Sequence, residues 1–426
     1  MLNTIANIIE MILSMAFSLK SVNEVKLKVY ITVFNRFLTT NIIQLVQFFI
    51  IAKYFSIVDN GKISILLTSS FLISQILLFG IPSSIVYFGS KNNILSVMKI
   101  VFKHISLLLL LLFTSLTVII PTLDDNYYYS SIAILSFTNV LYFISQSFFQ
   151  MKENFRIQNI IMILQTLSTF FAVSLYVIVD FKTDYILFIV IFNIIASIFS
   201  MYLVLKDVLN IHEDNLVNCE RVSFYKYSFG IYLNSLLSVI NGRLDVLIIG
   251  AILGNYFAGL YSFIVQISER MAIFSQVITT VLFPKFSKEN NINKVLSSSI
   301  KSLIFTFCIT FIAYFIFLYL IPYLNDVLFS SKYNPAIPYV KYGLLAVLFN
   351  STARVIYMTF SSLGLIKLNF KIGVLISLIT LLLFPFFCYT YGLSGAVISL
   401  MLTSVISLSI SFFILIKCKK NNSYEK

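Results

Sequence analysis

Long apolar stretches alternate with short polar segments along almost the whole chain. A transmembrane helix needs about 20 mostly apolar residues, and the stretches reach that length again and again. They are too long and too uniformly apolar for the alternating strands of an outer-membrane barrel, which have about ten residues each. The pattern predicts an all-α membrane protein with about twelve spans. We expect these spans at residues 29–54, 63–89, 104–122, 128–150, 157–179, 185–205, 227–253, 257–283, 302–322, 336–363, 372–391 and 393–416.

The chain outside these spans is short, so no sizeable soluble domain is expected on either side of the membrane. The first 18 residues are apolar but lack the basic start and the small-residue cleavage site of a signal peptide, and an interfacial helix is expected there. The expected parts are an N-terminal segment (1–28), an N-terminal six-helix bundle (29–206), a linker (207–226), a C-terminal six-helix bundle (227–416) and a basic tail (417–426).

Composition and charge refine this picture. With 59% hydrophobic and 11% charged residues, the chain is far more apolar than a soluble domain, in which about 25% of residues are charged. The net charge of +13 is spread in small groups between the spans, so it does not indicate nucleic-acid binding. Of the 30 Lys and Arg residues, 21 fall on the side of the two termini and five on the other side. Because cytoplasmic loops carry the excess, both termini are predicted to be cytoplasmic.

The two halves of the chain show a weak internal repeat. Residues 59–64 and 257–262 have similar sequences, lie 198 residues apart and are separated by six expected spans. The same shift superimposes two polar stripes at i, i+4, i+8 and i+11, which is one face of a helix. A parallel repeat with the substrate path at the interface of the two bundles is therefore expected. The stripes are Arg36, Thr40, Gln44 and Gln47 in the first half, and Asn234, Ser238, Gly242 and Asp245 in the second.

Four arginines lie inside expected spans, at Arg36, Arg243, Arg270 and Arg354. Charge at membrane depth is expensive, so such side chains usually face a cavity or a partner. The acidic residues Asp245 and Glu269 could lock the second bundle by cross-helix pairing, for example between Asp245 and Arg270, because neighbours in sequence do not face each other on a helix. They could equally bind a coupling ion, and the sequence leaves both interpretations open.

A guanidinium group in a wet cavity suits phosphate or carboxylate, which it binds through two parallel hydrogen bonds. A substrate with a pyrophosphate or an acidic sugar would fit. The candidate cavity residues are Arg36, Gln44, Gln47, Asn234, Asn241, Arg243, Arg270, Asn350 and Arg354, with Asp245 and Glu269 assigned to ion coupling or inter-helix pairing.

Enzymatic sites are weakly represented in this sequence. Asp124 and Asp125 form a carboxylate pair in a short outer loop, which indicates a solvated turn. No Ser/His/Asp set, P-loop or Gly-rich phosphate cradle occurs, so we expect neither an enzyme nor a cofactor. The four cysteines show no metal-ligand spacing and no disulfide framework. His104 and His212 fall between spans and are interpreted as solvated or interfacial side chains.

Several short motifs resemble one transporter family in their order and spacing. They include Gly-Ile-Pro-Ser-Ser at 80–84, Arg243-Leu-Asp245, Gly259-Leu-Tyr261-Ser262 and Leu-Phe-Pro-Lys-Phe-Ser at 282–287. The chain resembles the Wzx-type O-antigen and capsule flippases of the multidrug/oligosaccharidyl-lipid/polysaccharide exporter superfamily. The resemblance implies two six-helix lobes that form a V around a cationic cavity, a MATE-like fold. It also implies that the protein flips oligosaccharide units across the bacterial inner membrane, coupled to an ion or proton gradient.

The partners implied by the resemblance are undecaprenyl-pyrophosphate-linked oligosaccharide, membrane lipids and other polysaccharide assembly proteins. Two alternatives stay open. A multidrug exporter of the same fold would share the architecture, although the first six expected spans contain no acidic residue. A membrane polymerase or glycosyltransferase of lipopolysaccharide assembly would need a large outer loop, and an outer segment above about 40 residues would favour that enzyme.

Overall fold

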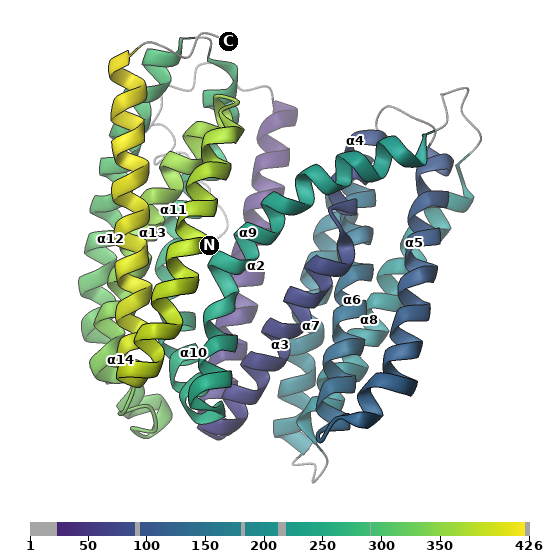
Figure 1. The fold of residues 1–426 in the computed structure, drawn as a ribbon, viewed down its shortest axis with the longest axis horizontal. Helices are drawn as coiled ribbons and strands as arrows, with labels where there is room; N and C mark the ends of the chain where they lie inside the picture. The colour runs from purple at the N-terminus through teal and green to yellow at the C-terminus, as the bar shows by residue number, and fades with distance from the viewer. Residues whose placement is uncertain (1–23, 90–93, 180–183, 212–218, 290, 422–426) are drawn as a thin grey trace.

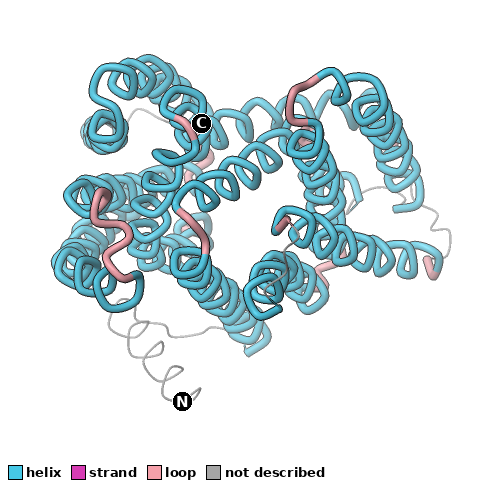
Figure 2. The backbone as a smooth tube through the Cα atoms, turned by 90° about the horizontal axis from the view of Figure 1, so that it is seen from below, coloured by secondary structure: helices cyan, strands magenta, loops and turns pink. Residues whose placement is uncertain are grey.

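The computed structural model describes residues 24–89, 94–179, 184–211, 219–289 and 291–421. Within these ranges every regular element is a helix (Figure 2). The helices are α2 (Glu24–Tyr54), α3 (Ile57–Leu78), α4 (Ile81–Gly89), α5 (Ile94–Thr114) with its π- and 3-10-helical continuation (Ser115–Thr122), α6 (Asn126–Met151), α7 (Phe155–Val179), α8 (Tyr185–Leu209), α9 (Arg221–Leu253), α10 (Asn255–Glu269), a 3-10 turn (Arg270–Ala272), α11 (Ile273–Lys288), α12 (Ile292–Phe329), α13 (Ile337–Ser362) and α14 (Ile366–Asn421).

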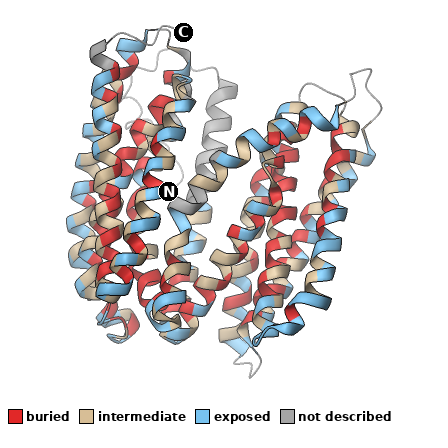
Figure 3. Ribbon diagram, viewed as in Figure 1, coloured by how far each residue is buried: buried red, intermediate tan, exposed pale blue. Residues whose placement is uncertain are grey.

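Eight of the described helices are long and apolar enough to cross a membrane, and α9 adds a ninth if its two parts count as one span. Exposed residues lie along the flanks of the molecule (Figure 3), and many of them are large and apolar. Leu110 and Phe113 of α5 are 64% and 66% exposed, and Phe413 of α14 is 69% exposed. Water-soluble proteins rarely expose such surfaces continuously, whereas lipid tails solvate them. The chain is a multi-pass membrane protein.

Several expected spans are broken in the structure. The expected span at 63–89 divides into α3 and α4 because Phe79 and Gly80 both have positive φ, 48° and 74°. The two parts of α9 meet at an angle of 57°. The expected span at 257–283 is interrupted by a 3-10 turn that begins at Arg270. In α14 the helix kinks at Gly392, which has a φ of 62°, and this position agrees with the boundary between the expected spans at 372–391 and 393–416. The hydropathy pattern places a boundary at Gly392 but does not mark the other three breaks, because the long apolar stretches continue on both sides of them.

The start of α3 differs from the sequence prediction, which placed residues 59–62 in an outer loop. Ser56 caps this helix, since its hydroxyl accepts a hydrogen bond from the backbone N–H of Asp59 at 3.0 Å and donates to the Asp59 carboxylate at 2.5 Å. An N-cap of this kind stabilises the N-terminus of a helix by satisfying a free backbone N–H, and α3 therefore starts at Ile57. Asp125 acts in a similar way for α6 by accepting from the N–H of Tyr128 at 3.2 Å, consistent with the solvated turn expected there.

The helices form two groups that diverge toward the end of the molecule where the C-terminus lies (Figure 1). The N-terminal group contains α3 to α8, and the C-terminal group contains α10 to α14. Helices α2 and α9 pack on both. Phe48 of α2 lies in the core of the C-terminal group, whereas Ile51 of α2 lies in a core shared with α3, α6, α7 and α8. Phe224 of α9 lies in the core of the N-terminal group, and Ile249 lies in that of the C-terminal group.

The groups meet at the opposite end, where α3 and α10 cross (Figure 1). A Cβ atom on Gly61 would lie 1.9 Å from the carbonyl oxygen of Asn255, and one on Gly259 would lie 2.0 Å from the carbonyl oxygen of Ile57. We call this contact the glycine crossing. Its residues are related in pairs by the shift of 198, because Ile57 corresponds to Asn255 and Gly61 to Gly259. This reciprocity is the geometry that a twofold-related repeat requires.

The segment 330–336, between α12 and α13, reaches from the C-terminal group to the end of α2. The Lys332 ammonium donates hydrogen bonds to the carbonyl oxygens of Ala52, at 3.0 Å, and of Phe55. Burial lowers the pKa of Lys332, and the nearby Asp59 carboxylate partly opposes that shift. Because Lys332 satisfies carbonyls at the C-terminal end of α2, it also complements the dipole of that helix.

Tyr333 adds a second link at the same place. Its hydroxyl accepts a hydrogen bond from the side-chain amide of Asn60 at 3.2 Å, and its ring stacks on Phe263 with centroids 4.0 Å apart. The backbone N–H of Tyr333 donates to the Asn325 side chain at 3.0 Å, which fixes the segment to α12. Together Lys332 and Tyr333 form the strap, a contact that holds the two groups together beside the glycine crossing.

Candidate functional site

Three of the arginines singled out in the sequence gather around one carboxylate in the C-terminal group. Arg243 lies on α9, Arg270 in the turn after α10, and Arg354 on α13. The Arg243 Nη1 atom lies 3.9 Å from Glu269 Oε2. The charge of Glu269 also acts on Arg270 and Arg354, and Arg243 is close enough to Arg270 to repel it. We call these four residues the cationic cluster.

The cluster leaves hydrogen-bonding capacity unused. The Nε atom of Arg270 is buried and has no hydrogen-bond partner in the described part of the chain. A guanidinium group carries five donors, and burying one of them unpaired is unfavourable. Glu269 and the nearby Asp245 offer two carboxylates to three guanidinium groups, so the site keeps an excess of positive charge. Guanidinium groups with unused donors can form charge-assisted hydrogen bonds to an anion.

The cationic cluster is partly exposed, and the charge of its side chains indicates that they do not face lipid. The side chains of Arg243 and Glu269 are 48% and 42% exposed. Asn350, one turn before Arg354 on α13, is exposed as well. Charged side chains in the middle of membrane-crossing helices are too costly to face lipid, so we expect them to face a polar space or a partner within the protein.

Asp245 does not belong to the cluster in the way the sequence suggested. Its carboxylate accepts a hydrogen bond from the Tyr261 hydroxyl at 2.5 Å and another from the backbone N–H of Val246 at 2.9 Å. The suggested partner Arg270 is not within ion-pair distance, and the observed ion pair joins Arg243 to Glu269. Pairing does cross between helices, but the partners differ, because spacing along a helix defines a face and says nothing of which neighbouring helix lies opposite.

The polar stripe of the first half is described only in part. Gln44 is exposed, and Gln47 accepts a hydrogen bond from the Thr169 hydroxyl of α7 at 3.3 Å. The side chains of Arg36, Asn234 and Asn241, which were also candidates, lie outside the described side chains.

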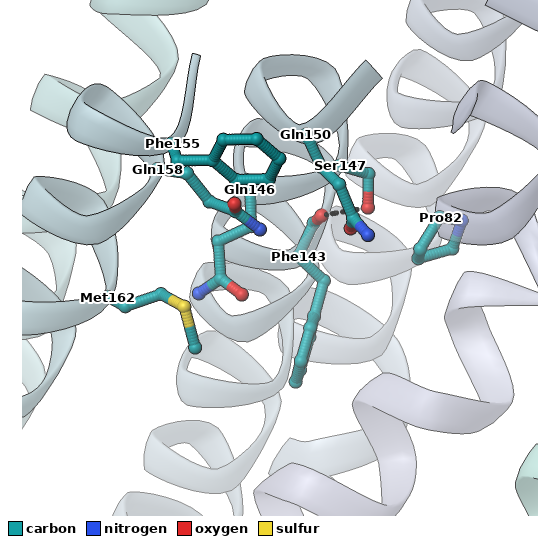
Figure 4. A pocket seen from close by; sticks show the side chains of 8 residues that line it. All are labelled: Pro82, Phe143, Gln146, Ser147, Gln150, Phe155, Gln158 and Met162. Carbon is teal, nitrogen blue, oxygen red and sulfur yellow. Dashed lines mark hydrogen bonds between the residues drawn. The ribbon is translucent and has the colours of Figure 1, made fainter. Parts of the chain in front are cut away.

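A second polar feature, which sequence reasoning missed, lies between α6 and α7. A cavity of about 450 Å³ opens at the turn that joins these helices (Figure 4). A signal was present, because Phe143, Gln146, Ser147 and Gln150 follow the i, i+3, i+4, i+7 spacing of one helix face. Neutral amides cost less in a membrane than charges, so their depth in the membrane alone does not indicate a site. The cavity is lined by Pro82, Phe143, Gln146, Ser147, Gln150, Phe155, Gln158 and Met162.

No three His, Cys, Asp or Glu side chains come together as a metal site among the residues that the structure describes. The longest connection between consecutive helices from 24 to 421 runs over residues 210–220, so no large loop stands beside the cationic cluster.

Solved transporter structures share this architecture. The lipid II flippase MurJ, in an inward closed conformation, matches with a TM-score of 0.71 and 15% identity over 90% of this chain and 87% of that one. An inward-facing multidrug resistance MATE family transporter of the MOP superfamily matches with a TM-score of 0.68 and 12% identity over 90% and 96%. The MATE multidrug transporter DinF-BH matches with 0.66 and 13% over 96% and 98%. At these identities the likeness shows a shared fold, and the predicted MATE-like fold is confirmed.

Sequence comparisons show the protein family of this chain. An uncharacterized membrane protein of Methanocaldococcus jannaschii is 23% identical over 241 residues, which are 54% of this chain and 57% of that relative. The match thus spans little more than half of the curated relative. The profile of the polysaccharide biosynthesis proteins matches residues 29–290, more than half of the chain. The chain therefore belongs to the polysaccharide biosynthesis protein family, as the motifs of its sequence indicated.

Proposed function

We propose that this protein is a flippase that moves undecaprenyl-pyrophosphate-linked oligosaccharide units across the bacterial cytoplasmic membrane for O-antigen or capsule assembly. The observation that carries the proposal is the cationic cluster, where three guanidinium groups, Arg243, Arg270 and Arg354, face only two nearby carboxylates, Glu269 and Asp245. A pyrophosphate matches this arrangement, because each guanidinium group can grip phosphate oxygens with two parallel hydrogen bonds. Family membership and the shared transporter fold support the same function.

Flipping requires that the cluster be reached alternately from the two sides of the membrane. Two helix groups that meet at one end and diverge toward the other suit such a change, since rocking about the cluster would open one end and close the other. In this proposal the glycine crossing faces outward and the diverging end faces the cytoplasm. Coupling to an ion or proton gradient belongs to the proposal, with Glu269 and Asp245 as the carboxylates able to exchange a cation.

The proposed topology has twelve spans with both termini in the cytoplasm, as the distribution of Lys and Arg predicts. Reporter proteins fused after Lys99, after Lys294 and at the C-terminus should report a cytoplasmic position. A reporter fused at Asp124 should report the outside. An external C-terminus would refute both the span number and the assignment of the glycine crossing to the outer face.

The function itself is tested at Arg354. Replacing it with Ala should abolish surface polysaccharide export while the protein stays inserted and abundant. Arg354→Lys should restore export only in part, because an ammonium group cannot offer the planar fork of a guanidinium. Arg221→Ala is the matched control, since Arg221 is an exposed arginine at the start of α9, outside the cluster. Loss of the Arg354→Ala protein from the membrane, or undiminished export, would refute a role in substrate binding.

A further inference from the structure

Neutral amide side chains follow one another along the interface of α6 and α7. On α6, Asn139, Gln146 and Gln150 lie at spacings of seven and four residues, which places them on one helix face. On α7, Gln158 and Gln165 lie seven residues apart and face them. Nothing in the cationic cluster involves these residues, which belong to the N-terminal group.

Some of these amides connect the two helices. The side chain of Gln146 donates to the Gln165 oxygen at 3.2 Å, and Gln165 donates to the Asn139 oxygen at 3.1 Å. Interhelical hydrogen bonds of this kind stabilise helix pairs in membranes, and this explains why the deeper amides are present.

The amides nearest the turn are different. Gln150 and Gln158 line the cavity, and neither side chain has a hydrogen-bond partner among the described residues. Gln158 is only 8% exposed. An amide offers two donors and an acceptor, and leaving them unused in a mostly buried side chain is unfavourable, so helix packing alone does not account for Gln158. Gln150 is exposed at the border of the same cavity. Figure 4 shows Gln158 beside the ring of Phe155, with Phe143 also lining the pocket.

The lining selects a class of ligand. No charged side chain borders the cavity, so it does not suit a phosphate or another ion. Its volume of about 450 Å³ falls in the range of about 300–1,000 Å³ found for small-molecule sites. Amides that can both donate and accept match hydroxyl groups, and aromatic rings match the apolar face of a ring-shaped ligand. A neutral sugar combines these two properties.

We propose that this cavity binds the saccharide part of the substrate, while the cationic cluster binds its pyrophosphate. The proposal rests on the proposed function and deepens it, because it assigns the two ends of one substrate to different helix groups. A substrate held at both ends would bridge the groups, and its binding would bias the positions of the groups relative to each other.

The test uses the full chain in lipid nanodiscs and two probes. One is undecaprenyl pyrophosphate, and the other is the glycosylated undecaprenyl pyrophosphate extracted from cells that carry this chain. Each of Gln150→Ala and Gln158→Ala should weaken binding of the glycosylated probe about two- to tenfold, the range for one lost hydrogen bond, and leave binding of the bare probe unchanged. Gln158→Asn, which keeps an amide, should recover part of the loss. Gln276→Ala, which removes an amide from α11, is the control and should change neither affinity.

The outcomes separate the two proposals. If wild-type protein binds both probes but the glutamine variants weaken neither, or weaken both equally, the saccharide site is refuted and the flippase stands. If wild-type protein binds neither probe, the proposed function fails and the saccharide site fails with it. Should one glutamine variant prove unstable, the other decides, since each side chain borders the cavity from a different helix.

Discussion

Replacing Gly61 with Ala should separate the two helix groups at the glycine crossing. The added Cβ would lie 1.9 Å from the carbonyl oxygen of Asn255 and 2.9 Å from the backbone nitrogen of Gly259, whereas ordinary contact begins at 3.4 Å. The helices must therefore move apart by about 1.5 Å, the difference between 3.4 and 1.9 Å. Because the obstacle is backbone, no change of side-chain rotamer can relieve it.

Overpacking of this kind costs about 1–3 kcal/mol. In a protein that interconverts between two arrangements, such a cost shifts the populations by a factor of about 5 to 150 away from the arrangement that contains the crossing. Alanine also gains about 1 kcal/mol of helix propensity over glycine, but this gain is the same whether or not the helices touch.

The assay is the distance between spin labels at Val58 and Tyr256, in a variant whose four cysteines have been replaced. These positions are exposed and lie near the starts of α3 and α10, and the shift of 198 relates them. Gly61→Ala should broaden the distances toward longer values and reduce export. Gly230→Ala is the matched control, because a Cβ at Gly230 would meet no atom within 4 Å. Distances that superimpose on those of the wild type, in a stable Gly61→Ala protein, would refute the reasoning.

Three further predictions concern the strap and Asp245. Lys332→Met leaves two carbonyl groups at the end of α2 without their donor, so the same spin-label distances should lengthen, and unchanged distances would contradict a role in closure. Because burial lowers the pKa of Lys332, the closed contact holds this proton less tightly than the separated groups do. Rising pH, toward the usual lysine pKa of about 10.4, should therefore favour the short distances, and lengthening with pH would show that the sign is wrong. Tyr261→Phe removes a hydrogen bond from the Asp245 carboxylate and should cost about 1–3 kcal/mol in thermal unfolding. In a double-mutant cycle with Asp245→Asn, strictly additive losses would exclude the contact.

The sequence located the helices well, because bilayer thickness dictates their length. The expected spans at 128–150 and 336–363 correspond to α6 and α13 within two residues at each end. It did not locate the breaks, which depend on single backbone conformations such as that of Phe79. The break before Gly80 matters for the site, since it turns α4 so that Pro82 borders the cavity beside α6.

The same contrast applies to the candidate site. The sequence indicated Arg243, Arg270 and Arg354, because a charged side chain at membrane depth has a high free-energy cost and usually has a functional or structural partner. The same argument could not indicate Gln150 and Gln158, because an uncharged amide in a membrane helix often only forms hydrogen bonds between helices. Their significance emerges from the cavity that both residues line and from the unpaired, mostly buried amide of Gln158, which are properties of packed neighbours and not of the sequence pattern.

The glycine crossing explains why the internal repeat is detectable at residues 59–64 and 257–262, which contain Gly61 and Gly259. A contact that lies on a twofold axis is made twice, so one residue must suit both helices at once. At the crossing the helix backbones come so close that a Cβ atom on either side would meet a carbonyl group. Gly61 and Gly259 are therefore required by the same close approach, whereas residues away from the axis contact different neighbours in each half and are free to differ. The polar stripes illustrate that freedom, because Gln47 bonds to Thr169 while its counterpart Asp245 bonds to Tyr261. Sequence differences at corresponding positions are therefore expected, because the N-terminal group has a neutral polar surface and the C-terminal group has a cationic one.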